Sequence, residues 1–171
     1  MSIARQMDRP VRDEAAYEHD FGRWAEVQAK RLRDRSAGDL DWDNLAEEIA
    51  SMGISQEREL LSRLTVIIEH LLKIEYGLRS EPRAGWRRTV NTQRIELARL
   101  LERNPGLRSG LAEAVAKVYP DALSQAFDAF DEYEPESTGI YEARLPFRLA
   151  YDAEQVISRD FMPEPPDSET A

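Results

Sequence analysis

The chain has 171 residues, no cysteine, a hydrophobic fraction of 42% and a charged fraction of 33%. This length fits one domain with a sizeable core, and the lack of cysteine excludes a disulfide framework, a thiolate metal site and a cysteine nucleophile. A formal net charge of -10 argues against a general nucleic-acid binder, because neutralising phosphates requires a surplus of lysine and arginine.

The N-terminal stretch 1–12 is polar and basic and lacks the apolar region of a secretory signal. The longest strongly apolar stretch, 60–74, is interrupted by charged residues and is too short to span a bilayer. We therefore expect a soluble, cytoplasmic protein with no membrane contact. Its expected organisation is a flexible N-terminus over 1–16, a single helical domain over 17–162 and a disordered acidic tail over 163–171.

Apolar residues recur at helical spacing along most of the chain, and strand-like alternation is nearly absent. The pattern predicts an all-α helical bundle of about five to seven helices. Asp20 is the expected cap of a first helix, which Gly38 would end. Asp41 would cap a short second helix that ends at Gly53.

Ser55 is the expected cap of the central helix, which we place near 56–76. At ~100° per residue, its apolar residues cover nearly half of the circumference, which suits a helix with two or more neighbours. These residues are Leu60, Leu61, Leu64, Ile67, Ile68, Leu71, Leu72 and Ile74.

The pattern predicts two further helices, from Trp86 to about 104 and over 107–119. Pro120 either starts a new helix or kinks a continuing one. The composition of 134–146 is typical of a loop, and Asp152 with Gln155 resembles the capping box of a short last helix.

The familiar signatures of enzymes are missing: the chain has no GxxxxGK[ST], GxGxxG, GxSxG or HExxH motif. A di-metal bundle would need a glutamate three residues before each histidine, but Ala16 precedes His19 and Ile67 precedes His70 at that spacing. We therefore predict no cofactor and no metal. The sequence does not decide whether the protein is an enzyme, and we favour a protein without enzymatic activity.

The first candidate site centres on His70, at the edge of the apolar arc and one helical turn from Lys73. Glu47 and Glu48 would join it if the short second helix folded back against the central one. A half-buried histidine near an ammonium and carboxylates can serve as an acid or base. The alternative, which we favour, is a boundary histidine whose nitrogens are satisfied by a carboxylate and a backbone carbonyl.

The second candidate site comprises Trp86, Arg87 and Arg94, since arginines beside an aromatic ring near a helix start suit phosphate or carboxylate groups. The alternative, again favoured, places Trp86 in the core and pairs the arginines with acidic residues. Gln93 falls inside the apolar arc, so we expect it to brace a neighbouring element.

Two weaker candidates rest on charge alone. The acidic residues between 128 and 136 could imitate a phosphate backbone for a nucleic-acid-binding partner or loosely hold divalent cations. The alternative, which we favour, is a solvated face and loop. Nucleic-acid contact through Arg88, Arg99 and Arg103 would have to overcome the net negative charge of the chain.

Several short runs resemble one family. They are Tyr17-Glu18-His19-Asp20-Phe21 with Trp24, Asp41-Trp42-Asp43-Asn44-Leu45-Ala46-Glu47-Glu48-Ile49 with Gly53, His70-Leu71-Leu72-Lys73, Trp86-Arg87 with Gln93-Arg94, and Asp160-Phe161-Met162-Pro163. Together they are similar to the bacterial domain-of-unknown-function family number twenty-nine, over nearly the whole chain. Ala150 stands where members often carry a proline before the last helix. The resemblance implies an all-helical, uncharacterised protein and supplies no catalytic or ligand-binding residues.

We therefore expect a non-enzymatic helical interaction module that self-associates or binds a protein partner. The alternative is an enzyme or binding protein for a phosphorylated small molecule or nucleotide. In that case Glu47, Glu48, His70 and Lys73 would do acid–base or metal work, and Arg87 and Arg94 would hold the anion.

Overall fold

The computed structural model describes residues 14–78 and 82–165, and the regular elements in these ranges are helices, without a strand. This confirms the predicted all-α class. The chain forms two compact units, Met1–Ile54 and Ser55–Ala171. The single domain over 17–162 stays a prediction. The expected flexible N-terminus and acidic tail lie mostly outside the described residues.

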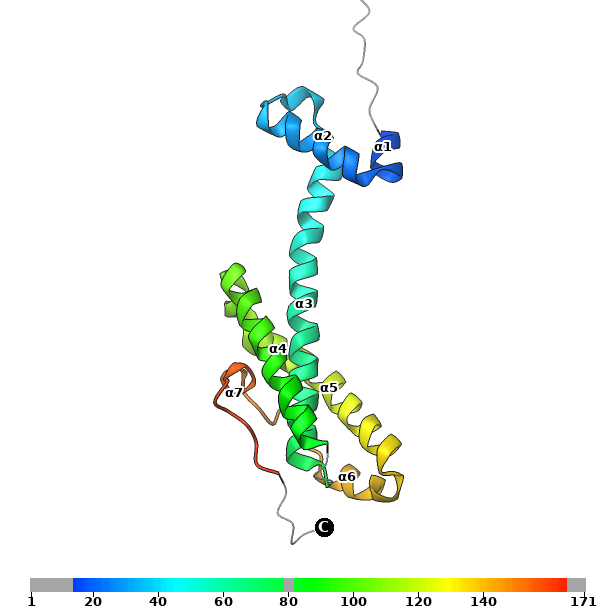
Figure 1. Ribbon diagram of the computed structural model, residues 1–171, viewed down its shortest axis with the longest axis vertical. Coiled ribbons are helices and arrows are strands. Elements are labelled where there is room, and N and C mark those ends of the chain that lie inside the picture. Colours follow the sequence, from blue (N-terminus) through cyan, green and yellow to red (C-terminus); the bar gives the residue numbers. More distant parts are fainter. Residues whose placement is uncertain (1–13, 79–81, 166–171) are drawn as a thin grey trace, which may run out of the picture. The chain divides into compact units, whose positions relative to one another are not determined.

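The first unit contains α1 (Glu14–His19), α2 (Phe21–Arg33), the 3-10 helix η1 (Ala37–Asp39) and the beginning of α3 (Figure 1). Asp20 caps α2 as predicted, because its carboxylate accepts a hydrogen bond from the backbone N–H of Arg23 at 2.9 Å. The helix ends earlier than expected. Arg35 takes a left-handed φ of 55° and turns the chain, whereas Gly38 lies within η1.

Helix α3 runs without a break from Trp42 to Tyr76, so the predicted helix end at Gly53 and new start at Ser55 are wrong. Its start is as expected, since the Asp41 carboxylate accepts from the backbone N–H of Asn44. A glycine inside a helix costs only about 1 kcal/mol relative to alanine, which the cooperative bonding of the flanking turns outweighs. Glu47 and Glu48 therefore lie on α3 itself and not on a separate short helix.

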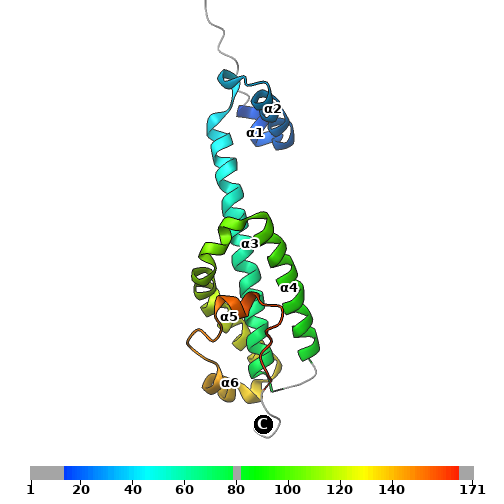
Figure 2. The same cartoon turned by 90° about the vertical axis from the view of Figure 1, so that its left-hand side faces the viewer.

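The second unit is built around the part of α3 that begins at Ser55. It also contains α4 (Arg83–Arg103), η2 (Pro105–Gly110), α5 (Leu111–Tyr133), η3 (Pro135–Ser137), α6 (Thr138–Arg144) and α7 (Ala153–Ile157). Figures 1 and 2 show α4 and α5 running along this part of α3. The predicted central helix near 56–76 is confirmed as this part of α3.

The core of the second unit gathers the apolar faces of α3, α4 and α5. Its contributions from α3 are Leu60, Leu64, Ile67, Ile68, Leu71, Leu72 and Ile74, all members of the predicted apolar arc. From α4 come Val90, Leu97, Leu100 and Leu101, and from α5 come Leu111, Ala114, Val115, Val118, Tyr119, Ala122 and Ala126. Leu61, the remaining member of the arc, is half-buried against this core.

Three elements after the central helix refine the expected order. Pro120 lies inside α5, which continues to Tyr133, so it does not start a new helix. The predicted loop over 134–146 holds η3 and α6 instead, and the buried Tyr141 of α6 stacks on Phe130 with ring centroids 4.1 Å apart. Helix α7 begins with the predicted capping box of Asp152 and Gln155. Among the described helices, none is long and apolar enough to cross a membrane.

Candidate functional site

The His70 cluster consists of Glu69, His70 and Lys73, adjacent on the surface of α3. Their side chains are 13%, 16% and 12% exposed, so all three are largely removed from water. The Lys73 ammonium lies 2.6 Å from one oxygen of Glu69, and Nδ1 of His70 lies 3.6 Å from the other. Glu69 was not among the predicted site residues, although its spacing of four residues from Lys73 is the usual signal for such a pair.

The tautomer of neutral His70 follows from its backbone contact. Nδ1 lies 2.9 Å from the carbonyl oxygen of Val66, which can only accept, so Nδ1 carries the proton. Nε2 then keeps its lone pair. Among the described residues it has no hydrogen-bond partner, yet it is not a buried unsatisfied atom, and so it reaches solvent.

The environment of His70 disfavours its protonated form. Burial lowers the pKa of His70, and the Lys73 ammonium lowers it further, while Glu69 and the Val66 carbonyl act in the opposite direction. The net effect is a pKa below the ordinary value of 6.5. At neutral pH this side chain is therefore a neutral imidazole with one accessible acceptor nitrogen.

Arg94 belongs to a different environment. Its side chain is 1% exposed and donates to three backbone carbonyls: Nε to Val156 at 2.9 Å, Nη2 to Gln155 at 2.8 Å and Nη1 to Phe161 at 2.6 Å. Burial lowers the pKa of Arg94 to about 10. The guanidinium thus holds the end of α7 and the following segment against α4, and the structure does not bring it into the His70 cluster.

Trp86 is half-buried and packs against the core, as the favoured alternative expected. Its ring lies so close to Gly77 that a Cβ atom at that position would approach ring carbons at 3.1 and 3.2 Å. Nearby, Nη2 of Arg83 donates to the Gly77 carbonyl at 2.7 Å. Arg87 is exposed.

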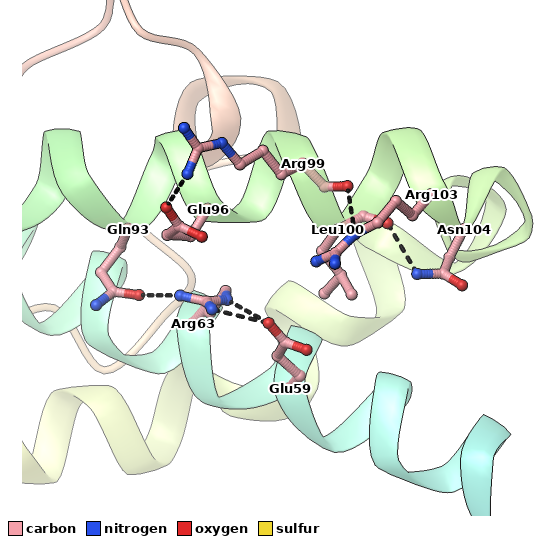
Figure 3. Close-up of polar contacts among 8 residues, drawn as sticks. All are labelled: Glu59, Arg63, Gln93, Glu96, Arg99, Leu100, Arg103 and Asn104. Atoms are coloured by element: carbon pink, nitrogen blue, oxygen red, sulfur yellow. Dashed lines mark hydrogen bonds and ion pairs between the residues drawn. The ribbon is translucent and has the colours of Figure 1, made fainter.

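Gln93 braces a neighbouring helix, as the sequence indicated. Its side-chain oxygen accepts from Nη1 of Arg63 on α3 at 3.0 Å, and Arg63 donates through Nε and Nη2 to Glu59 at 3.0 and 2.8 Å. Figure 3 shows this network linking α3 and α4. In the same view Arg99 pairs with Glu96 at 2.6 Å.

In the first unit, Glu48 is tied to α1. The Tyr17 hydroxyl donates to it at 2.6 Å, and this hydrogen bond is the main reason that the pKa of Tyr17 is raised to about 12. Glu47 is exposed. The structure therefore gives the two glutamates different surroundings.

A second polar cluster was not predicted from the sequence. The buried Tyr151 donates its hydroxyl to Glu75, and the pKa of Tyr151 is raised, first by burial and then by this bond. Tyr119 donates to the carbonyl of Pro146 at 2.8 Å, and burial raises the pKa of Tyr119 to about 12. Both tyrosines hold the segment between α6 and α7 against the core. This role could not be predicted from residue spacing, because the bonded partners are far apart in the sequence.

An open groove of about 310 Å³ lies among α3, η2 and α5. Its apolar lining includes Leu60 and Leu107, and its rim carries Lys117 and Glu57, which lie 3.6 Å apart. The volume of the groove is at the lower end of the range found for ligand pockets. None of the predicted site residues lines it. Within the described ranges, no three histidine or acidic side chains are grouped so as to hold a metal ion.

Comparison with known proteins gives one result. The family model described as "Domain of unknown function DUF29" matches residues 16–162, most of the chain. The chain belongs to the DUF29 family. No curated protein and no solved structure matches it. Its function is unknown, and family membership assigns neither an enzymatic activity nor a partner.

The residues that carry the DUF29 resemblance contact one another within each unit. In the first, Tyr17 bonds Glu48, and Nε1 of Trp24 donates to Asp41 at 3.1 Å. In the second, Arg94 bonds the Phe161 carbonyl. The quoted motifs thus include pairs that hold distant segments of the chain together.

Proposed function

We propose that this DUF29 protein is a non-enzymatic helical interaction module that docks through its first unit. The observation that carries the proposal is how little of this unit is buried. Over residues 17–54, the buried side chains are Trp24 and Gln28. Several large apolar side chains are exposed instead: Phe21, Leu32, Trp42, Ile49, Met52 and Ile54.

A unit this small does not ordinarily stay folded on so small a core. Chains of about 40–60 residues bury a smaller share of their surface than larger domains do, and many domains of this size are stabilised by disulfides, a metal or association. Each Å² of apolar surface removed from water stabilises the folded state by about 25 cal/mol. A partner that covers the exposed side chains would therefore complete the core that the unit lacks.

The exposed residues of α3 form a defined face. Trp42, Leu45, Ile49 and Met52, here called the Trp42 stripe, are three, four and three residues apart, the spacing of a coiled-coil seam. Trp42, Ile49 and Met52 are 59%, 69% and 62% exposed, and Leu45 is half-buried. Such a seam is suited to a helix of a second copy or of another protein.

Site-specific photo-crosslinking in the source organism tests this function. A photoreactive amino acid at Ile49 should give covalent adducts of higher mass. The matched control is Ile54, which is 57% exposed on the same helix but about 160° from the centre of the stripe. Adducts from Ile49 and none from Ile54 support the proposal. No adduct from Ile49, or equal adducts from both, overturns it.

A second candidate function is binding of a phosphorylated small molecule at the His70 cluster. The observation in its favour is the Lys73 ammonium, one helical turn from His70 on α3, although Glu69 already pairs with Lys73 and Arg94 is bonded elsewhere. Phosphate or a nucleotide should then raise the Tm of the wild type and leave that of Lys73→Gln unchanged. Equal shifts for both proteins would contradict it. A cytoplasmic location stays a prediction.

A further inference from the structure

The Trp42 stripe has edges with little charge. At ~100° per residue, the small residues Ala46 and Gly53 border one side of the stripe and Glu48 borders the other. Glu48 is half-buried, and its carboxylate accepts a hydrogen bond from the Tyr17 hydroxyl at 2.6 Å. The other acids on this stretch of α3 lie about 140–180° from the centre of the stripe, on the far side of the helix.

This charge pattern suits an identical face. In coiled coils, charged residues beside the seam form the ion pairs that select one partner over another. The Trp42 stripe has the apolar seam, but this stretch of α3 contributes one charged side chain to its edges. A two-fold dimer brings the same face of two copies together, so it needs a face whose edges do not repel each other. The Trp42 stripe meets this condition.

The residue types of the stripe favour two parallel helices. Trp42 and Ile49 occupy the a positions of a heptad, and Leu45 and Met52 occupy the d positions. A β-branched residue at a with leucine at d is typical of parallel two-stranded coiled coils. Ile49 and Leu45 follow this pattern at the centre of the stripe.

Glu48 distinguishes the parallel pairing from the antiparallel one. Glu48 is at a g position, which in a parallel pair faces the e position five residues further along the other helix, namely Gly53. An antiparallel pair that matches the stripe end to end would instead bring the two Glu48 side chains together near the two-fold axis. Like charges there are repulsive, so Glu48 favours the parallel pair.

From these features we infer that the Trp42 stripe binds the Trp42 stripe of a second copy, in a parallel two-fold dimer. The inference rests on the proposed function and names the partner. It requires enough exposed apolar surface to hold two copies together. A specific protein interface buries at least about 1,000 Å² in total.

The exposed apolar surface reaches this area. Trp42, Ile49 and Met52 are 59%, 69% and 62% exposed, and Phe21 is 51% exposed. Phe21 lies toward the Glu48 edge of the stripe, because its ring centroid is 6.1 Å from that of Tyr17. At about 200 Å² per large side chain, these four residues expose roughly 480 Å² on each copy, or about 1,000 Å² for two.

Sedimentation equilibrium of the full chain tests the inference. The wild type should form a dimer whose fraction rises with concentration. Ile49→Glu should raise the Kd of the dimer at least about tenfold, and the control Ile54→Glu, on the other side of the helix, should raise it by less than about twofold. Circular dichroism should show the same helix content in all three proteins. A wild type that stays monomeric, or equal effects of the two variants, overturns the inference.

Single cysteines test the orientation, because the chain has no cysteine of its own. Met52→Cys should form a disulfide-linked dimer on mild oxidation, since position 52 of one copy faces position 52 of the other in a parallel pair. Ile54→Cys is the matched control and should form none. The antiparallel pair separates the two positions 52 by about 15 Å along the helix. A disulfide that forms only when Met52→Cys is mixed with Trp42→Cys therefore overturns the parallel dimer.

Failure of the inference is distinguishable from failure of the proposed function. Adducts from the photoreactive residue at Ile49 with twice the mass of the chain support both. Adducts of another mass, with a wild type that sediments as a monomer, would leave the interaction module standing and overturn the second copy as its partner. The absence of adducts from Ile49 would remove both.

Discussion

The guanidinium of Arg94 donates to three backbone carbonyls that lie 61, 62 and 67 residues further along the chain. The sequence places Arg94 at the edge of an apolar face but cannot indicate partners that far away, because backbone acceptors have no sequence signature. Gln93 is the opposite case. A buried amide inside an apolar arc needs a hydrogen-bond partner, so a contact with a neighbouring helix could be predicted, although not that the partner is Arg63.

Replacing Arg94 tests its structural role. Arg94→Lys keeps the charge but cannot reproduce the three-way contact, and it leaves buried carbonyl oxygens without donors. We expect the free energy of unfolding to fall by on the order of 2–4 kcal/mol, measured by urea denaturation. The control is Arg88→Lys, at an exposed position of the same helix, which should change stability by less than about 0.5 kcal/mol. Similar losses for the two variants would contradict this role.

His70 should make folding sensitive to acid. Its pKa in the folded chain is lowered below 6.5 by burial, so the unfolded chain binds the proton more tightly. The stability that neutral His70 permits is fully present above about pH 6.5 and is lost as the pH falls through and below that value. His70→Gln, which can still donate to Val66, should therefore lose less stability on acidification than the wild type.

Urea unfolding at several pH values on either side of 6.5 measures this difference. The matched control is His19→Gln, since His19 is exposed at the end of α1. That variant should follow the wild-type pH dependence. A His70→Gln curve parallel to that of the wild type would show that His70 is protonated equally in both states.

At the scale of elements, α3 shows where local signals mislead. Gly53 and Ser55 look like the end of one helix and the cap of the next, but the helix passes through both. Local residues bias a helix end by about 1 kcal/mol, and the turns on both sides can outweigh that bias. Similarly, the polar composition of 134–146 concealed α6, whose burial of Tyr141 and Leu145 is a tertiary effect.

Gly53→Ala distinguishes a continuous α3 from a break. In a continuous helix the new methyl group meets no neighbour within 4 Å, and alanine should stabilise the protein by about 0.5–1 kcal/mol. If Gly53 ended a helix in the left-handed conformation, alanine would destabilise it by about 1 kcal/mol or more. Thermal unfolding monitored by circular dichroism gives the sign.

At the scale of the whole molecule, the helical class, the apolar arc of the central helix and the family could all be predicted from the sequence. The difference in burial between the two units could not. The stripe from Trp42 to Met52 and the arc from Leu60 to Ile74 both have helical apolar periodicity, but only the second is buried. Periodicity identifies an apolar face and carries no information on what covers it.

The candidate site around His70 was likewise predictable only where its residues are neighbours on one helix. The sequence indicated that His70 and Lys73 lie near each other, because residues three apart on a helix are neighbours. The expectation that Glu47 and Glu48 join them was based on a helix end at Gly53, whereas α3 continues through that residue. The contacts that assign Arg94 to the C-terminal segment are equally tertiary.

We propose that the first unit lacks a complete core of its own and gains one from a partner. Hydrogen exchange of backbone amides in the monomeric chain tests this proposal, because protection reports the free energy of local opening. Amides of α2 should exchange at least about a hundredfold faster, relative to their intrinsic rates, than amides around Leu97 and Leu100 in α4. Amides of α2 as strongly protected as those of α4 would contradict it, since the first unit would then be stable without a partner.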